Sequence, residues 1–253
     1  MNRKYLSYIF FVVVPMGVSY FMYKHFILKQ LTPEFNNNSS TTLSNIPQEK
    51  PVDSFSTTTR YYELSYEVPK DNRIVAQSIK DRAEKWLVDT NITKVTSDQQ
   101  AEQDLGIFEG LKYAYDSKYK VVDANEYTSY VETVYEFTGG AHGATNNIAY
   151  IFSKKDGKQI NSLRDIYNDS IYSALSVYSR KELPSQLAKK TIIVSEFQDM
   201  FDDGTEARQE NWQTFYLKQN SLVIIFGQYQ VGPYVIGIHE LEVPLTVLEK
   251  YKK

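Results

Sequence analysis

The chain has 253 residues, 42% of them hydrophobic, which is long and apolar enough to bury the core of one or two folded domains. Its 28 basic and 31 acidic side chains nearly balance and form no basic stripe, so nucleic-acid binding is not expected. Because the chain has no cysteine, disulfides, thiolate nucleophiles and cysteine zinc sites are excluded, and a metal in a folded domain would need carboxylates, His142 or His239 as ligands.

The N-terminus carries an uncharged apolar run. After Arg3 and Lys4, residues 5–23 read YLSYIFFVVVPMGVSYFMY, which as a helix would span about 28 Å, close to the thickness of a bilayer core. We expect a cytoplasmic stub at 1–4, one transmembrane anchor at 5–23 and an extracytoplasmic remainder, that is, a single-pass protein of the cell membrane. A cleaved signal peptide with a small-x-small site at 17–19 is the alternative, and it also exports the rest.

Residues 24–59 are expected to form a flexible linker. The segment is rich in Asn, Ser, Thr and Pro, as in NNNSSTTLSN and IPQEKPVDSFSTTT. Such a composition buries too little apolar surface to offset the entropy lost on ordering. The linker would hold the folded part away from the membrane.

A first extracytoplasmic α+β domain is expected over residues 60–153. The predicted elements are a strand at 60–68, an amphipathic helix at 71–89 and three strand-like runs at 106–119, 126–138 and 146–154, the last ending at the hairpin dipeptide Asp156-Gly157. The predicted inner face of the helix consists of Ile74, Val75, Ile79, Ala83, Trp86 and Leu87, with Trp86 in the core. The three runs indicate an antiparallel meander.

A second α+β domain is expected over residues 154–253. Asn168, Asp169 and Ser170 predict the start of a helix that continues through Leu183, and residues 189–201 are expected to be helical as well. Strands are predicted within NWQTFYLKQN (211–220), SLVIIFGQYQV (221–231) and IHELEV (238–243), before a short helix after Pro244. The predicted fold class is α+β, with antiparallel sheets and packed helices behind one transmembrane helix.

The stretch 137–146 reads FTGGAHGATN and lies between two predicted strands. A phosphate-binding glycine loop needs a helix after it, so nucleotide binding is not expected. One interpretation is a hairpin connection in which Gly139, Gly140 and Gly143 supply positive φ angles. The other is a binding loop whose small residues let a partner approach the backbone and His142 closely. The two interpretations are compatible.

The segment 200–205 reads MFDDGT and resembles the TFDDG motif of polysaccharide deacetylases, in which one aspartate is a base and the other helps to hold a metal. That chemistry also needs two histidines about one helical turn apart, and the chain downstream offers only His239. Asp202 and Asp203 are therefore interpreted as a solvated turn or cap. The chain has no GxSxG elbow either, and no catalytic residue is assigned.

Glu132 and Glu136 form a second carboxylate pattern, on one side of a predicted strand. Spacing alone leaves a glycosidase pair open. Among 31 acidic residues, however, such a pair arises easily by chance.

The chain has 21 tyrosines, which suit both the margins of antiparallel sheets and surfaces that contact sugars or proteins. Most are assigned to the sheets. Tyr229 and Tyr234, in FGQYQVGPYVIG, lie among glycines and a proline and are the candidates for a shaped binding surface.

Two segments together resemble a known family. These are FTGGAHG (137–143) and YQVGPYVIGIHELEVP (229–244), with KKDGKQINSLRDIY between them. They resemble the tandem extracytoplasmic domains that form the outer part of lysozyme-sensing anti-sigma factors and precede the catalytic domain of PdaC-type peptidoglycan deacetylases. The resemblance covers residues 61–250. The positions that match well enough to carry over are Gly139, Gly140, Ala141, His142 and Gly143.

The resemblance implies recognition at the cell envelope. In the sensing relatives the outer region binds lysozyme, so we expect a non-catalytic, membrane-anchored module for a lysozyme-like protein or peptidoglycan, without a cofactor. The expected ligand-binding residues are the loop 139–143 together with Tyr229 and Tyr234. Residues 1–4 are too short for the cytoplasmic domain of an anti-sigma factor, and we expect no appended deacetylase domain. The alternative is a metal-dependent deacetylase or hydrolase of the wall that uses Asp202, Asp203, His142 and His239.

Overall fold

The structure is a computed structural model that describes residues 52–94 and 111–253. The anchor predicted at 5–23 and most of the predicted linker lie outside these residues. Within the described residues, no helix combines the length and the apolar character that crossing a bilayer requires.

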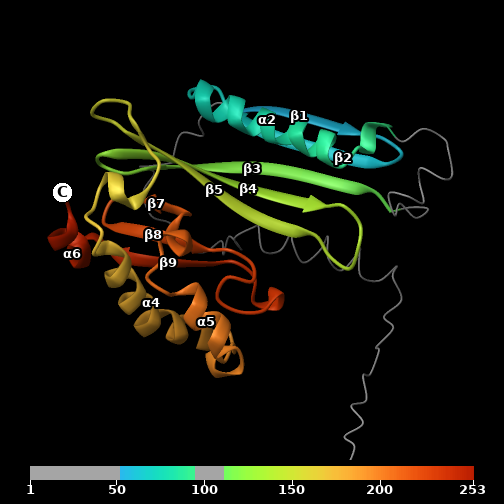
Figure 1. Cartoon of the computed structure of the whole chain (residues 1–253). Coiled ribbons are helices and arrows are strands. Elements are labelled where there is room, and N and C mark those ends of the chain that lie inside the picture. Colours follow the sequence, from blue (N-terminus) through green and yellow to red (C-terminus); the bar gives the residue numbers. More distant parts are fainter. Residues whose placement is uncertain (1–51, 95–110) are drawn as a thin grey trace, which may run out of the picture. The chain divides into compact units, whose positions relative to one another are not determined.

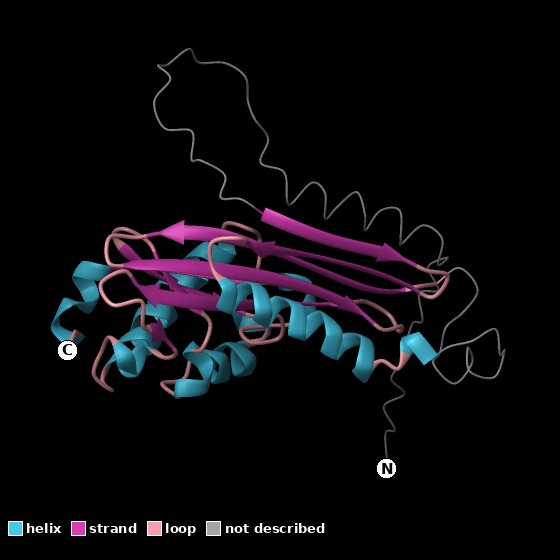
Figure 2. Cartoon of the chain, turned by 90° about the horizontal axis from the view of Figure 1, so that it is seen from above, coloured by secondary structure: helices cyan, strands magenta, loops and turns pink. Residues whose placement is uncertain are grey.

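A six-stranded sheet is formed by the N-terminal part of the described chain (Figures 1 and 2). Its strands lie in chain order: β1 (Val52–Thr58), β2 (Tyr62–Pro69), β3 (Tyr113–Asp123), β4 (Tyr127–Phe137), β5 (Ala144–Ser153) and β6 (Gln159–Ile160). Neighbouring strands are antiparallel except β2 and β3, which are parallel. The predicted α+β class and the meander β3–β5 are confirmed. The purely antiparallel sheet was wrong, because a helix lies between β2 and β3 in the chain and parallel neighbours need such a long connection.

That helix is α2 (Arg73–Asp89), which lies along one face of the sheet (Figure 1). Its N-cap is Asn72, whose side chain accepts hydrogen bonds from the first-turn amides, and a 3-10 turn, η1 (Ile92–Lys94), follows it. The helix buries Val75, Ile79, Ala83 and Trp86, as predicted from the apolar spacing. Ile74 was wrongly assigned to this face, since it is 58% exposed.

The C-terminal part forms a three-stranded antiparallel sheet with β8 in the centre. Its elements are α4 (Ile171–Ala188), α5 (Gln198–Gly204), β7 (Phe215–Leu217), β8 (Ser221–Phe226), β9 (His239–Pro244) and α6 (Leu245–Leu248). Short 3-10 turns lie between them: η2 (Leu163–Asp165), η3 (Val194–Glu196), η4 (Gln209–Trp212), η5 (Tyr234–Ile236) and η6 (Glu249–Tyr251). Every residue of β8 is buried, which explains the continuous apolar run that predicted a strand there.

The two sheets pack face to face. Val131 of β4 packs against Tyr216, Val223 and Ile225 of the smaller sheet, and all four are at most 2% exposed. Figure 1 shows the resulting layers, with α2 on one side of the large sheet and the three-stranded sheet, α4 and α5 on the other. This packing places the loop between β4 and β5 beside the connection between β8 and β9.

Several boundaries differ from the sequence prediction. Residues 52–58, placed in the linker, form β1, an edge strand with exposed side chains whose order comes from the hydrogen-bond ladder with β2. The predicted strand 221–231 ends at Phe226, and the strand predicted within 211–220 covers only Phe215–Leu217. The division into domains at 153/154 stays a prediction.

Candidate ligand-binding site

The loop 138–143 joins β4 to β5, which confirms the predicted hairpin connection. Gly139 and Gly140 have φ angles of 93° and 91°, in the region that side chains rarely adopt. Gly143 was wrongly given the same role, since its φ is not positive. A Cβ atom added to Gly143 would lie 2.4 Å from the ring of Tyr135, so this glycine allows close packing of that ring instead.

The connection 227–238 joins β8 to β9 and contains the second part of the site. Tyr229 has a φ of 64°, which is uncommon for a residue with a side chain, and it is 53% exposed. Further on, Tyr234 begins the turn η5, and Gly237 ends it with a φ of 74°. A left-handed tyrosine persists only where its surroundings hold it, so this connection has a defined shape.

The two connections meet through their aromatic side chains. The rings of His142 and Tyr234 stack with centroids 3.9 Å apart and planes 21° apart. The Tyr229 hydroxyl lies 3.5 Å from His142 Nε2, and the Tyr229 and Tyr234 ring centroids are 5.7 Å apart. His142, Tyr229 and Tyr234 therefore form one group of rings, called the aromatic cluster below. The sequence-predicted residues from two distant segments are thus brought together.

Hydrogen bonds between side chains and backbone groups also link these two parts of the chain. The Tyr234 hydroxyl donates to the Gly143 carbonyl oxygen at 2.9 Å, and His142 Nδ1 lies 3.0 Å from that oxygen. A carbonyl oxygen can only accept, so Nδ1 is the donor in this contact. The Thr145 amide donates to Oε1 of Gln228 at 2.9 Å. The arrangement is held by polar contacts as well as by ring stacking.

Neither connection carries a formal charge. No Asp, Glu, Lys or Arg occurs from Phe137 to Ser153 or from Gln219 to Ile238. Tyrosine is neutral near pH 7. The site is therefore an aromatic surface with uncharged polar groups beside the His142 imidazole.

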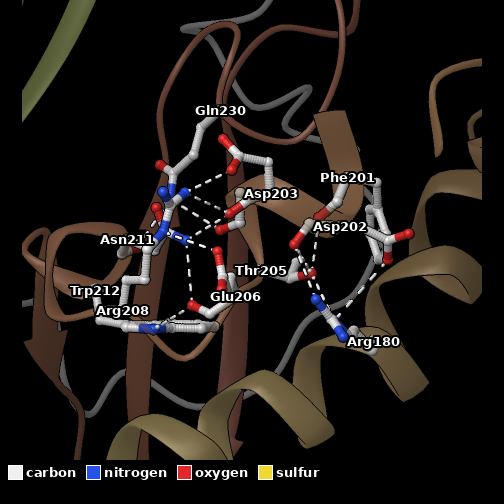
Figure 3. A network of polar contacts seen from close by, with 11 residues as sticks. Arg180, Phe201, Asp202, Asp203, Thr205, Glu206, Arg208, Asn211, Trp212 and Gln230 are labelled. Carbon is white, nitrogen blue, oxygen red and sulfur yellow. Dashed lines mark hydrogen bonds and ion pairs between the residues drawn. The ribbon is translucent and has the colours of Figure 1, made fainter. Parts of the chain in front are cut away.

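The MFDDGT segment contacts Gln230, the residue that follows Tyr229 (Figure 3). The Gln230 amide group donates to the carbonyl oxygens of Asn211 at 2.8 Å and Gly204 at 3.4 Å, and it accepts from the Gly227 amide at 3.0 Å. A Cβ atom on Gly204 would lie 1.8 Å from the Gln230 carbonyl oxygen, so the two backbones are in direct contact. The end of α5 thus fixes the chain next to Tyr229.

Asp202 and Asp203 lie in the last turn of α5, not in a free turn. Asp203 forms an ion pair with Arg208 at 2.7 Å, and the Asp202 carboxylate lies 4.0 Å from Arg180. The same arginines donate to the backbone carbonyls of Asp202 and Asp203, at 2.9 Å and 3.1 Å (Figure 3). Helix ends leave such carbonyls without helical partners, so the arginines stabilise the end of α5. Both carboxylates have a structural partner.

His239 is the second histidine of the catalytic alternative, and it is 5% exposed at the start of β9. Burial lowers the pKa of its imidazole, the positive charge of Lys190 lowers it further, and Nε2 is buried without a hydrogen-bond partner. Across residues 52–94 and 111–253, no group of three or more His, Asp and Glu side chains is placed to hold a metal ion.

The Glu132 and Glu136 pair is not an open carboxylate pair. Glu132 is fully buried and accepts hydrogen bonds from the hydroxyls of Ser117 at 2.7 Å and Tyr150 at 3.1 Å, with Arg82 Nε at 3.5 Å. Burial raises the pKa of the Glu136 carboxyl group. A glycosidase needs both carboxyl groups at the substrate, and here the Glu132 carboxylate is enclosed in the core beneath α2 while Glu136 is only partly buried.

Sequence reasoning missed the residues that hold the aromatic cluster, namely Gln228, Gln230 and Tyr135. A signal was present for two of them. The glutamines flank Tyr229 as GQYQ within a stretch that has no charged residue, and an amide side chain in such a stretch needs a hydrogen-bond partner. The contact of Tyr135 with Gly143 had no comparable local signal.

The comparisons with known proteins confirm the resemblance inferred from sequence. Residues 55–145 match the family model described as "Deacetylase PdaC", and residues 164–246 match that described as "Protein of unknown function (DUF3298)". The loop 138–143 lies in the first matched region and the connection 227–238 in the second. The aromatic cluster therefore joins the two matched regions.

Similar proteins include one curated relative and two solved structures. The chain is 27% identical over 138 residues, 53% of its length, to the peptidoglycan-N-acetylmuramic acid deacetylase PdaC of Bacillus subtilis, and the match spans only 28% of that protein. A DUF3298 family structure from Bacteroides fragilis matches with a TM-score of 0.58 at 17% identity, over 80% of this chain and 93% of that one. One from Pseudomonas aeruginosa matches at 0.51 and 15%, over 81% and 94%. These structures share the fold.

Proposed function

We propose that the chain is an extracytoplasmic recognition module of the cell envelope, which binds a lysozyme-like protein or peptidoglycan through the aromatic cluster and performs no chemistry on it. The observation that carries the proposal is the stacking of His142 on Tyr234. This contact combines the two connections into one surface and leaves Tyr229 half exposed. Exposed, well-anchored aromatic residues are typical of binding surfaces.

The cell-wall context comes from the curated relative, whose name states that it acts on peptidoglycan. Only 28% of that protein is matched, so we take from it the context and not the reaction. The apolar run at 5–23 supports an anchor in the cell membrane with the described residues outside.

The absence of chemistry is proposed from the partners of the acidic residues. The carboxylate of Asp203 is paired with Arg208, and that of Asp202 faces Arg180. Glu132 is buried, and His239 is buried at the start of a strand. In residues 52–94 and 111–253, none of these four side chains contacts His142, Tyr229 or Tyr234, so a ligand bound at the aromatic cluster meets no carboxylate from this set.

The proposal is tested by capture. The full chain, purified in a mild detergent, is incubated with immobilised lysozyme and separately with purified peptidoglycan sacculi. We expect retention on at least one, and a loss of about tenfold or more when His142→Ala and Tyr229→Ala are combined. Asp203→Asn is the matched control and should be retained like the wild type. The proposal would be contradicted if the double variant were retained as well as the wild type, or if the wild type were retained on neither matrix.

The same preparation tests the enzymatic alternative. We expect no release of acetate from acetylated peptidoglycan. Chelator-sensitive release that Asp202→Asn abolishes would place the protein among the deacetylases.

The proposed location is tested on intact cells. Protease added outside should release a folded fragment by cleaving between Leu31 and Pro51, because β1 begins at Val52 and the sequence before it is rich in small polar residues, which proteases favour. A fragment that stays protected until the cells are lysed would exclude export.

A further inference from the structure

The Tyr229 ring is presented to solvent in a fixed orientation. It is 53% exposed, while its hydroxyl lies 3.5 Å from His142 Nε2 and its ring lies 5.7 Å from that of Tyr234 at an angle of 42°. A ring already held by its neighbours loses little further conformational entropy when a ligand stacks on it. Tyr229 is therefore preorganised as a platform.

The backbone beneath Tyr229 is held by Gln230 (Figure 3). Its side chain bonds to backbone groups of Gly227, Gly204 and Asn211, and its own carbonyl packs directly on Gly204. Asn211 is in turn bonded to the carbonyl oxygens of Asp203 at 2.6 Å and Glu206 at 3.1 Å. These contacts fix the left-handed conformation of Tyr229 to the end of α5.

The polar groups beside the ring are uncharged. The side chain of Gln228 accepts from the Thr145 amide through Oε1, and within the described part of the chain its Nε2 group has no partner. This amide is free to donate to a ligand. Thr138, on the neighbouring connection, and Asn146, near the start of β5, are exposed as well.

The charge pattern distinguishes between ligand classes. A strongly basic protein such as lysozyme would gain from carboxylates at its docking surface, and an anion would gain from lysines or arginines. Residues 137–153 and 219–238, which include both connections, contain neither carboxylates nor lysines or arginines. A sugar ring, by contrast, has an apolar C–H face and a rim of neutral hydroxyl and amide groups, which complement an aromatic ring and a free amide.

We propose that the aromatic cluster binds an uncharged glycan made of N-acetylated hexosamines, with one pyranose ring stacked on Tyr229 and the Gln228 amide donating to a substituent of the same chain. This inference rests on the proposed function and narrows its ligand to the glycan.

The test titrates soluble N-acetylglucosamine oligomers into the full chain by calorimetry. Tyr229→Ala should weaken binding about tenfold or more, because the stacking platform is removed, whereas Tyr229→Phe should stay within about threefold. Gln230→Ala should weaken binding by a factor between about three and about ten, because the Tyr229 ring remains but its backbone is held less firmly. Raising the salt from about 50 mM to about 500 mM should change Kd less than about twofold, because no ion pair forms. Val88→Ala, an exposed apolar truncation on α2, is the control.

The outcomes separate this inference from the proposed function. Tyr229-dependent capture of lysozyme without binding of the oligomers overturns the glycan assignment and leaves the recognition module in place. Oligomer binding that Tyr229→Ala leaves unchanged, or that falls steeply with salt, also overturns the assignment. If the wild type binds neither lysozyme, sacculi nor oligomers, both are overturned. Circular dichroism of each variant confirms that the fold is kept.

Discussion

The glycine loop at 138–143 and the MFDDGT segment at 200–205 both look like functional motifs. Their contacts differ: the loop meets uncharged aromatic side chains, and the MFDDGT segment meets arginines. In the loop, His142 is exposed and stacks on Tyr234 from another connection, with no formal charge nearby in either segment. In MFDDGT, the side chains and carbonyls are bonded to Arg180, Arg208 and Asn211 within the same region.

The role of each motif follows from the residues that contact it. A pair of adjacent aspartates is reactive only if a substrate or metal can reach it, and here each faces an arginine. A histidine between glycines gains a role only when other groups converge on it, and here two tyrosines do. The aspartate segment serves the loop site, because it holds Gln230 beside Tyr229.

The largest expected effect comes from Gly204→Ala, which tests whether MFDDGT is a structural support. The new Cβ atom would lie 1.8 Å from the Gln230 carbonyl oxygen, a backbone atom that cannot move aside alone. We expect a loss of about 3 kcal/mol or more in the free energy of unfolding, measured in urea. Gly227→Ala is the control, since nothing lies within 4 Å of its added Cβ. If the two variants lost equal amounts of unfolding free energy, the contact between Gly204 and Gln230 would not be a structural support.

A smaller effect is expected for Gly143→Ala, which tests the packing beneath the loop. Its Cβ atom would meet the Tyr135 ring at 2.4 Å, so the ring must shift, at a cost of about 1–3 kcal/mol in stability. Because Gly143 also accepts the Tyr234 hydrogen bond, ligand capture should fall with it. Gly140→Ala meets no atom and should cost only about 1 kcal/mol, through its φ of 91°. A larger loss of stability for Gly140→Ala than for Gly143→Ala would contradict the close packing of Tyr135 on Gly143.

The pH dependence of stability tests the assignment of His239 to the core. Its pKa in the folded state is lowered by burial, so as pH falls the unfolded state binds the proton first. Stability is complete above the unfolded value of about 6.5 and decreases as pH falls from there towards the folded pKa. The slope should reach at most about 1.4 kcal/mol per pH unit. His239→Gln should flatten this part of the curve, and an unchanged slope would contradict the assignment.

The smallest effect is expected for Asp203→Asn. Its ion pair with Arg208 is partly exposed, at 71% and 45% of the two side chains, so its loss should cost less than about 1 kcal/mol. Binding should stay unchanged, because the backbone carbonyl that holds Asn211 remains. Thermal unfolding and the capture assay check both points. A binding loss as large as that of the His142 and Tyr229 double variant would mean that the carboxylate contacts the ligand.

Elements with a local sequence pattern could be predicted without the structure. The helical spacing of Val75, Ile79, Ala83 and Trp86 predicted the core face of α2, since apolar residues at this spacing lie on one side of a helix. Alternating and aromatic runs predicted β3 to β5, and the glycines between two of them predicted the hairpin at 138–143. β1 was missed because an exposed edge strand is ordered by its hydrogen bonds and carries no apolar pattern.

Contacts between these elements could be read only from the folded chain. The parallel pairing of β2 with β3, the room at Gly143 for Tyr135 and the partners of Asp202 and Asp203 all depend on residues distant in the sequence. The packing of Val131 against Tyr216, Val223 and Ile225 sets the two sheets face to face, and only then do His142 and Tyr234 stack. Local patterns depend on a few neighbouring side chains, whereas this contact depends on how two complete sheets bury their apolar faces.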